Sequence, residues 1–146
     1  MSSKNINLEE LKKIQFDILK KVAAFCEKNK IKYYLGYGTL LGAVRHKGYI
    51  PWDDDIDIIM PRPDYLRFIE IFNKSTPSPE LKVLSHYIDK NHPYPFIKLI
   101  NTKTKQVSHS SIKYDMGVCI DIFPLDGLPK SIHKSNFLYA KVYHIM

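Results

Sequence analysis

The sequence predicts an α+β protein in which helices flank a mixed β-sheet. One long segment, residues 8–29, repeats apolar residues at helical spacing. Shorter segments rich in Ile, Val, Tyr and Phe are bounded by Gly, Pro, Asn or Asp, which is typical of strands. The 146 residues are 45% hydrophobic and 25% charged, the composition of an ordinary globular protein, and we expect one domain over 1–146.

The N-terminal helix is predicted from its cap and from its periodicity. Asn7 followed by Glu10 is typical of a capping box, in which side chains and backbone of the first turn bond one another. A single apolar stripe then continues to about residue 29 and comprises Leu11, Ile14, Ile18, Val22 and Phe25. We expect this helix to be scaffold.

The next elements alternate between strands and helices. The segment IKYYLGYG predicts a strand that leads into a glycine turn, and TLLGAVR predicts a short helix. After the loop HKGYIPWDD, the apolar run IDIIM predicts a strand that Pro61 and Pro63 end. Pro63 also suits the first turn of a helix in DYLRFIEIFNK. These elements begin a catalytic sheet that we expect over residues 31–129.

The second half predicts further strands and a last helix. LKVLSHYI and PFIKLINTKT are most simply an antiparallel pair, VSHSSIKYDM is irregular, and GVCIDIF is a strand that Pro124 stops. Residues 131–146 have helical spacing but end on an apolar residue without a cap. We therefore expect a truncated helix and an N-terminal portion of a longer protein. The uncovered apolar face of this helix predicts a homo-oligomer, a crystal-packed face or poor solubility.

Charge indicates which classes of partner to expect, and cysteine content indicates the cell compartment. The formal charge of +7 favours anionic partners such as phosphates, nucleic acid or an acidic membrane face, although a basic surface also serves solubility. The two cysteines, Cys26 and Cys119, lie in apolar contexts without disulfide or zinc spacing, as in reduced cytosolic proteins. No signal peptide or membrane-spanning run is present. We expect a cytoplasmic protein, with peripheral contact at the inner membrane face left open.

Acidic residues mark the candidate site. Asp53, Asp54, Asp55 and Asp57 place four carboxylates in five positions just before an apolar run. On a strand, Asp55 and Asp57 share one face about 7 Å apart, whereas Asp54 points away. Asp121, between two isoleucines, places another acid on a strand, where it is costly unless paired or bound to metal. If the two strands are neighbours, Asp55, Asp57 and Asp121 converge on a divalent cation, Mg²⁺ or Mn²⁺.

The segment YGTLLGAVRHK is a candidate phosphate site. At the start of its helix, Gly38 lets a ligand approach the backbone, and free N–H groups there suit a phosphate. The hydroxyl of Thr39 adds one more hydrogen bond. Arg45 and Lys47 belong to a basic triplet suited to the negative charge at a phosphoryl centre.

Two further substrate-binding candidates have structural alternatives. The ring of Trp52 suits a quaternary ammonium such as choline, but a hydrophobic plug beneath its loop is the better-supported interpretation. Lys98 either points from its strand into the cleft or faces solvent. Asp53 and Asp54 serve equally well as loop caps or as ligands. The tyrosines at 33, 34 and 37 are expected to belong mostly to the core.

The order of these pieces resembles the nucleotidyltransferase fold of polymerase-β-like enzymes. GTLLGAVRHKGYIPWDDDIDIIMPRPDYLRF further resembles the signature of the LicD family, and GVCIDIFPLDGLP its second block. The family includes bacterial phosphorylcholine transferases and is related to fukutin-type proteins. The resemblance implies that Asp55, Asp57 and Asp121 hold magnesium, and that Gly38 and Thr39 form the nucleotide-phosphate turn. It also implies that Asp121 takes the proton from the attacking hydroxyl.

The resemblance implies a metal-dependent transferase. It moves a phosphate-bearing group, phosphocholine first among several, from a CDP-activated donor to a hydroxyl of a cell-surface glycan, such as lipopolysaccharide or teichoic acid. The resemblance also implies a further helical part, before which we expect this chain to stop. An inactive nucleotide-sensing or nucleic-acid-binding module is the alternative. Because the basic residues are dispersed and no aromatic-interleaved basic strand occurs, we expect no nucleic-acid partner.

Overall fold

The computed structural model describes residues 5–76, 78–106, 116–128 and 130–131. Its elements are, in order, α1 (Leu8–Lys28), β1 (Tyr34–Leu35), α2 (Tyr37–His46), β2 (Asp57–Pro61), α3 (Arg62–Phe72), β3 (Leu81–Leu84), β4 (Ile97–Asn101) and β5 (Cys119–Leu125). The irregular segment at 107–115 and the helix expected over residues 131–146, with the oligomer inferred from it, lie outside these described residues apart from residue 131.

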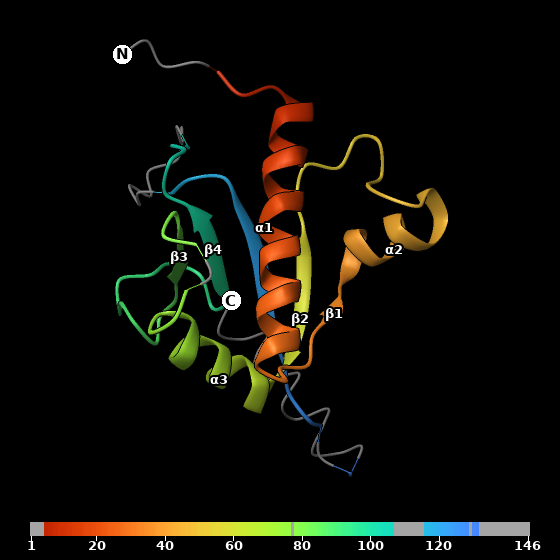
Figure 1. Cartoon of the computed structure of the whole chain (residues 1–146). Coiled ribbons are helices and arrows are strands. Elements are labelled where there is room, and N and C mark those ends of the chain that lie inside the picture. The colour runs from red at the N-terminus through yellow and green to blue at the C-terminus, as the bar shows by residue number, and fades with distance from the viewer. Residues whose placement is uncertain (1–4, 77, 107–115, 129, 132–146) are drawn as a thin grey trace.

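The strands form one mixed sheet in the order β1-β2-β5-β4-β3. Only β2 and β5 run parallel, and each of the other neighbouring pairs, β3 with β4 included, is antiparallel. The expected α+β fold with a mixed sheet is therefore confirmed, as is the adjacency of the two acid-bearing strands. Figure 1 shows β2 near the centre of the sheet, with β1 and α2 to one side and β3 and β4 to the other.

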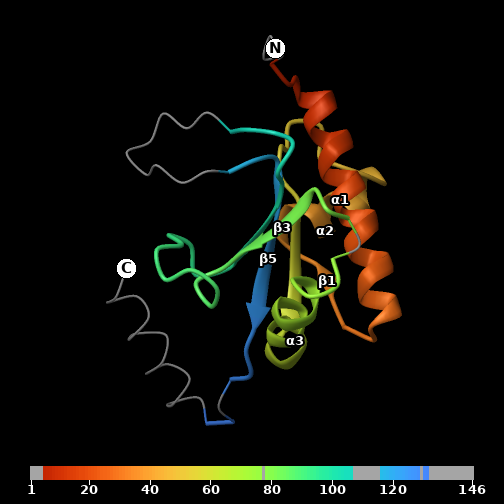
Figure 2. The ribbon, with the colours of Figure 1, turned by 60° about the vertical axis from the view of Figure 1, so that its left-hand side comes forward.

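Helix α1 begins where its sequence predicts. The capping box is complete, because Asn7 Oδ1 accepts from the backbone N–H of Glu10 and Glu10 Oε2 accepts from the backbone N–H of Asn7. The helix lies along one side of the strands (Figure 2) and buries Ile18, Val22 and Phe25 against them. Cys26 is buried in the same core, and both cysteines are free. Alternate strand residues such as Ile58 and Ile122 complete that aliphatic layer.

Pro61 ends β2 as expected, whereas β5 does not stop at Pro124 but continues to Leu125. The register explains why the sheet accommodates both prolines. β1 pairs only as far as Ile59, and β4 pairs with β5 only as far as Ile122, so each proline nitrogen lacks a ladder partner on that side. Proline is tolerated where no ladder hydrogen bond is needed.

Helix α2 turns its small residues inward. It begins at Tyr37, within the expected glycine turn and before the expected helix start at Thr39. Tyr37 adopts a left-handed φ of 42°. A Cβ at Gly42 would lie 2.5 Å from the carbonyl oxygen of Gly48, so only glycine allows the following loop to pack so close. The large apolar side chains on the outer face are exposed. They are Tyr37, Leu40, Leu41 and Val44.

Candidate functional site

The centre of the site is a row of three charged residues across three strands. Asp57 on β2 is the register partner of Asp121 on β5, and Asp121 is the register partner of Lys98 on β4. The Lys98 ammonium donates to both carboxylate oxygens of Asp121, at 2.7 and 2.8 Å. These three side chains leave the sheet on the face opposite to the buried isoleucines, because strand residues alternate between faces. Of the two alternatives for Lys98, the solvent-facing one does not hold, since its side chain is only 12% exposed.

Asp55 joins this row from the loop that precedes β2. The strand starts at Asp57, so strand alternation does not govern residues 53–55. Carboxylate oxygens of Asp53, Asp54 and Asp55 all lie within 4.8 Å of one another. The expectation that Asp54 points away from its neighbours is therefore wrong. The structure brings together more acids than the sequence predicted, and they are split between a loop cluster and a strand row.

Burial and mutual repulsion raise the pKa of two of these carboxyls. Burial contributes most for Asp57, followed by the charges of Asp55 and Asp121, and together they raise its pKa to about 6. The pKa of Asp55 is also raised, by burial first and then by Asp53 and Asp54. Lys98 acts on the pKa of Asp57 in the opposite direction, as a nearby cation must. Because a bound cation would relieve the repulsion among these carboxylates, the site favours cation binding.

The start of α2 is bonded directly to the acidic strand. The hydroxyl of Thr39 accepts from the backbone N–H of Asp57 at 2.8 Å, and the N–H of Gly36 donates to the carbonyl of Asp57 at 2.9 Å. A Cβ at Gly38 would lie 2.8 Å from a carboxylate oxygen of Asp53. The predicted phosphate turn therefore lies against the acidic loop, and a larger residue at position 38 would have to displace the side chain of Asp53.

Two residues that position the site were not identified from the sequence. Gln15, buried in α1, donates from Nε2 to the carbonyl of Asp54 at 2.9 Å and to the carbonyl of Cys119 at 3.2 Å. The hydroxyl of Tyr49 donates to Gln15 Oε1. Gln15 thus ties the acidic loop to the strand that carries Asp121. The only available signal was a polar residue near the apolar stripe of an amphipathic helix.

A cleft of about 780 Å³ opens beside the acids. Asp55, Asp121, Lys98 and Tyr94 contribute to its wall, together with Gln15. Carboxylate oxygens are hard donors of the kind that Mg²⁺ and Mn²⁺ prefer, and those of Asp53, Asp54 and Asp55 lie close enough together to hold one ion. The residues present therefore fit a divalent cation.

The remaining substrate-binding candidates are exposed. Arg45 and Lys47 are exposed at the C-terminal end of α2, whereas the acids adjoin its N-terminal end. Trp52 is 80% exposed near His46, so the interpretation as a plug beneath the loop is wrong. Tyr34 and Tyr37 are also exposed rather than part of the core. Arg45, Lys47 and Trp52 as substrate contacts stay predictions.

Comparison with known proteins identifies the class. A mixed sheet with acids on adjacent parallel strands is the arrangement expected of a nucleotidyltransferase. Residues 30–144 match the family described as LicD/FKTN/FKRP, nucleotidyltransferase domain. The chain belongs to the LicD family, which confirms the resemblance seen in its motifs.

Three relatives are similar to this chain over part of their length. It is 37% identical to lipopolysaccharide cholinephosphotransferase LicD of Haemophilus influenzae over 126 residues, covering 86% of this chain and 47% of that protein. It is 35% identical to an uncharacterised protein of Rickettsia prowazekii, covering 87% of this chain and 37% of that protein. An uncharacterised protein of Rickettsia typhi is 40% identical over 79 residues, covering 54% of this chain and 24% of that protein. The chain thus spans less than half the length of these curated relatives.

Within the described residues, no helix has both the length and the apolar character that crossing a membrane requires.

Proposed function

We propose that this chain forms the catalytic core of a magnesium-dependent transferase that moves phosphocholine, or a similar phosphate-bearing group, from a CDP-activated donor to a glycan hydroxyl. One observation carries this proposal: Asp57 and Asp121 are register partners on adjacent parallel strands, beside a cleft large enough for a nucleotide donor. The similarity to the H. influenzae cholinephosphotransferase supports the choice of phosphocholine and of a lipopolysaccharide-type acceptor.

Each acid has a proposed role. Asp55, Asp57 and Asp121 hold Mg²⁺ (or Mn²⁺) and face the diphosphate of the donor. When bound, the ion neutralises negative charge on the phosphate oxygens and so favours attack at phosphorus. Gly38 and Thr39 offer the start of α2 to the nucleotide phosphates. Arg45, Lys47, Lys98 and Trp52 are the proposed contacts to the rest of the donor.

The transfer itself replaces one phosphorus–oxygen bond with another. The acceptor oxygen attacks the phosphorus that carries choline, and the bond from that phosphorus to the bridging oxygen breaks. CMP leaves with the bridging oxygen and its electron pair, and the hydroxyl proton passes to Asp121. The protein contributes orientation and charge neutralisation, which are the main sources of catalysis in phosphoryl transfer.

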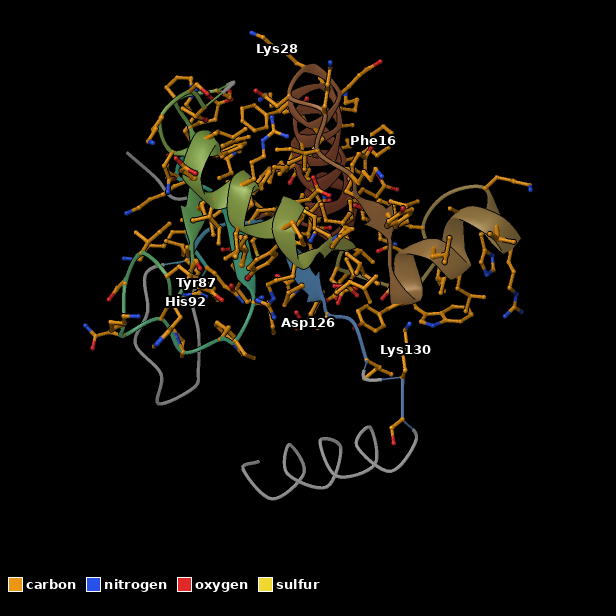
Figure 3. All side chains as sticks on the ribbon, turned by 90° about the horizontal axis from the view of Figure 1, so that it is seen from below. Phe16, Lys28, Tyr87, His92, Asp126 and Lys130 are labelled. Atoms are coloured by element: carbon orange, nitrogen blue, oxygen red, sulfur yellow. The ribbon has the colours of Figure 1, made fainter. Side chains whose placement is uncertain are left out.

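A thermal-shift comparison tests the proposal on the full chain. Wild-type protein should gain melting temperature with Mg²⁺ and CDP-choline together, whereas Asp55→Asn and Asp57→Asn should lose most of that gain. The matched control is Asp126→Asn, because Asp126 (labelled in Figure 3) directly follows β5 and pairs with Arg62. In Asp55→Asn and Asp57→Asn, the rate of transfer to the glycan, measured in a longer form of the protein, should fall by about two to three orders of magnitude. Equal donor binding by the wild type and both site variants would refute the metal site.

A further inference from the structure

We propose that Lys98 is the second cation of this site, so that the enzyme binds one divalent ion where related chemistry often uses two. The inference rests on the proposed function. Asp55, Asp57 and Asp121 hold the divalent ion, and Asp121 also accepts hydrogen bonds from the ammonium of Lys98, which takes the place of a second ion.

The geometry around Lys98 is that of a built ammonium site. Its Nζ lies 2.7 and 2.8 Å from the two oxygens of Asp121, so both oxygens are engaged. The ring centroids of Tyr94 and Phe96 lie 4.7 and 5.3 Å from the same nitrogen, within the range of cation–π attraction. The side chains of Lys98 and Asp121 are 12% and 16% exposed. An ion pair so enclosed is costly to break, unlike a pair at the surface.

The pairing is also imposed by the backbone. Lys98 and Asp121 are direct register partners on antiparallel strands, where cross-strand side chains stand about 4.5–5.5 Å apart at Cβ. Asp121 is at the same time the register partner of Asp57 on its other side. The ammonium is therefore held one strand away from Asp121 and two strands from Asp57. A lysine in this position cannot be exchanged or chelated away.

The pairing of Asp121 with Lys98 favours one divalent ion at the strand row, because both oxygens of Asp121 already accept from the ammonium. A second divalent ion would have to displace the ammonium from both oxygens of Asp121. In two-metal sites the ions lie about 3.5–4 Å apart and clamp the attacking and leaving oxygens. Lys98 is placed to supply one half of such a clamp on the donor phosphate.

Counting bound Mn²⁺ tests this inference directly. Wild-type full chain, titrated with Mn²⁺ alone and followed by electron paramagnetic resonance of the free ion, should bind one ion. Lys98→Met keeps the length of the side chain without its charge and should bind two. Lys98→Arg should return the number to one. The matched control is Lys82→Met on neighbouring β3, where the lysine is exposed, and it should also bind one.

The outcomes separate the two proposals. Wild-type protein that binds two Mn²⁺ ions overturns the inference even if the Lys98 variants fail to fold. One ion in both the wild type and Lys98→Met overturns it as well, but leaves the proposed transferase intact. No Mn²⁺ bound by the wild type overturns the proposed function and the inference with it.

Discussion

The two faces of the central strands have opposite chemistry. On β5, Ile120 and Ile122 point into the core beneath α1 and α3, whereas Asp121 and Phe123 point to the open face. The core face is aliphatic and fully buried, and it stabilises the fold by removing apolar surface from water. The open face collects like charges that repel one another until a cation arrives. Apolar burial on the core face therefore stabilises the fold, whereas repulsion among the carboxylates on the open face destabilises it.

The largest effect should follow from a change on the core face. Ile122 is 0% exposed, so Ile122→Ala leaves a cavity and should lower the free energy of unfolding by about 2–5 kcal/mol. Chemical denaturation measures this loss, and Ile122→Val should cost only about 0.5–1.5 kcal/mol. Mn²⁺ affinity of the folded protein should stay unchanged, because the side chain faces away from Asp121. A parallel loss of metal affinity would break the separation of the two faces.

A smaller effect on stability, but one that reaches the site, is expected at Gln15. Gln15→Leu removes the donor to the carbonyls of Asp54 and Cys119 and should cost about 1–3 kcal/mol. Because the acidic loop loses its anchor to β5, Mn²⁺ affinity should fall as well. Phe16→Ala, at an exposed neighbour on the same helix, should leave metal affinity unchanged. Unaltered Mn²⁺ affinity in Gln15→Leu would show that Gln15 stabilises the core but does not position the acidic loop.

Removing a charge from the open face should raise stability, whereas the changes at Ile122 and Gln15 should lower it. The pKa of Asp57 is raised from 3.8 to about 6, so the folded protein binds this proton more tightly than the unfolded chain does. Without metal, stability therefore falls as the pH rises from about 4 to about 6 and stays lower at pH 7. The shift corresponds to roughly 3 kcal/mol, which solvent screening of a half-exposed carboxyl reduces to about 1–2 kcal/mol.

Melting curves of Asp57→Asn and wild type across this pH range measure that effect. Without metal, the variant should be the more stable protein at pH 7, and the difference should vanish near pH 4. Mg²⁺ should stabilise the wild type and leave the variant nearly unchanged. A variant that is less stable than the wild type at pH 7 would contradict the repulsion on the open face.

The smallest effect is expected at the N-terminal cap of α1. Asn7→Ala removes one half of the capping box and should cost about 1 kcal/mol. Since the cap bonds only the first turn, neither Mn²⁺ affinity nor the pH profile should change. Asn7→Ser, which retains a capping oxygen, should recover most of the loss.

Local pattern predicted much of this architecture. The capping box at Asn7, the helix after it and the acid-bearing strands were all readable, because a periodicity of 3.6 or 2 reports which side of an element is buried. The extent of β5 was less well predicted, since the tolerance of Pro124 depends on where the neighbouring β4 stops. The exposure of Tyr34, Tyr37 and Trp52 was missed, because an aromatic residue in an apolar segment gives no sign of which neighbours will cover it.

The sequence by itself determined the α+β class, the LicD motifs and the acids of the candidate site. Only the tertiary structure decided which groups those acids meet: Lys98 against Asp121, Thr39 on the backbone of Asp57, and Gln15 beneath the loop of Asp54. The physical reason is the range of the interactions. Helix caps and strand alternation depend on residues a few positions apart, whereas these contacts depend on strand order and register, which the packing of the whole chain sets.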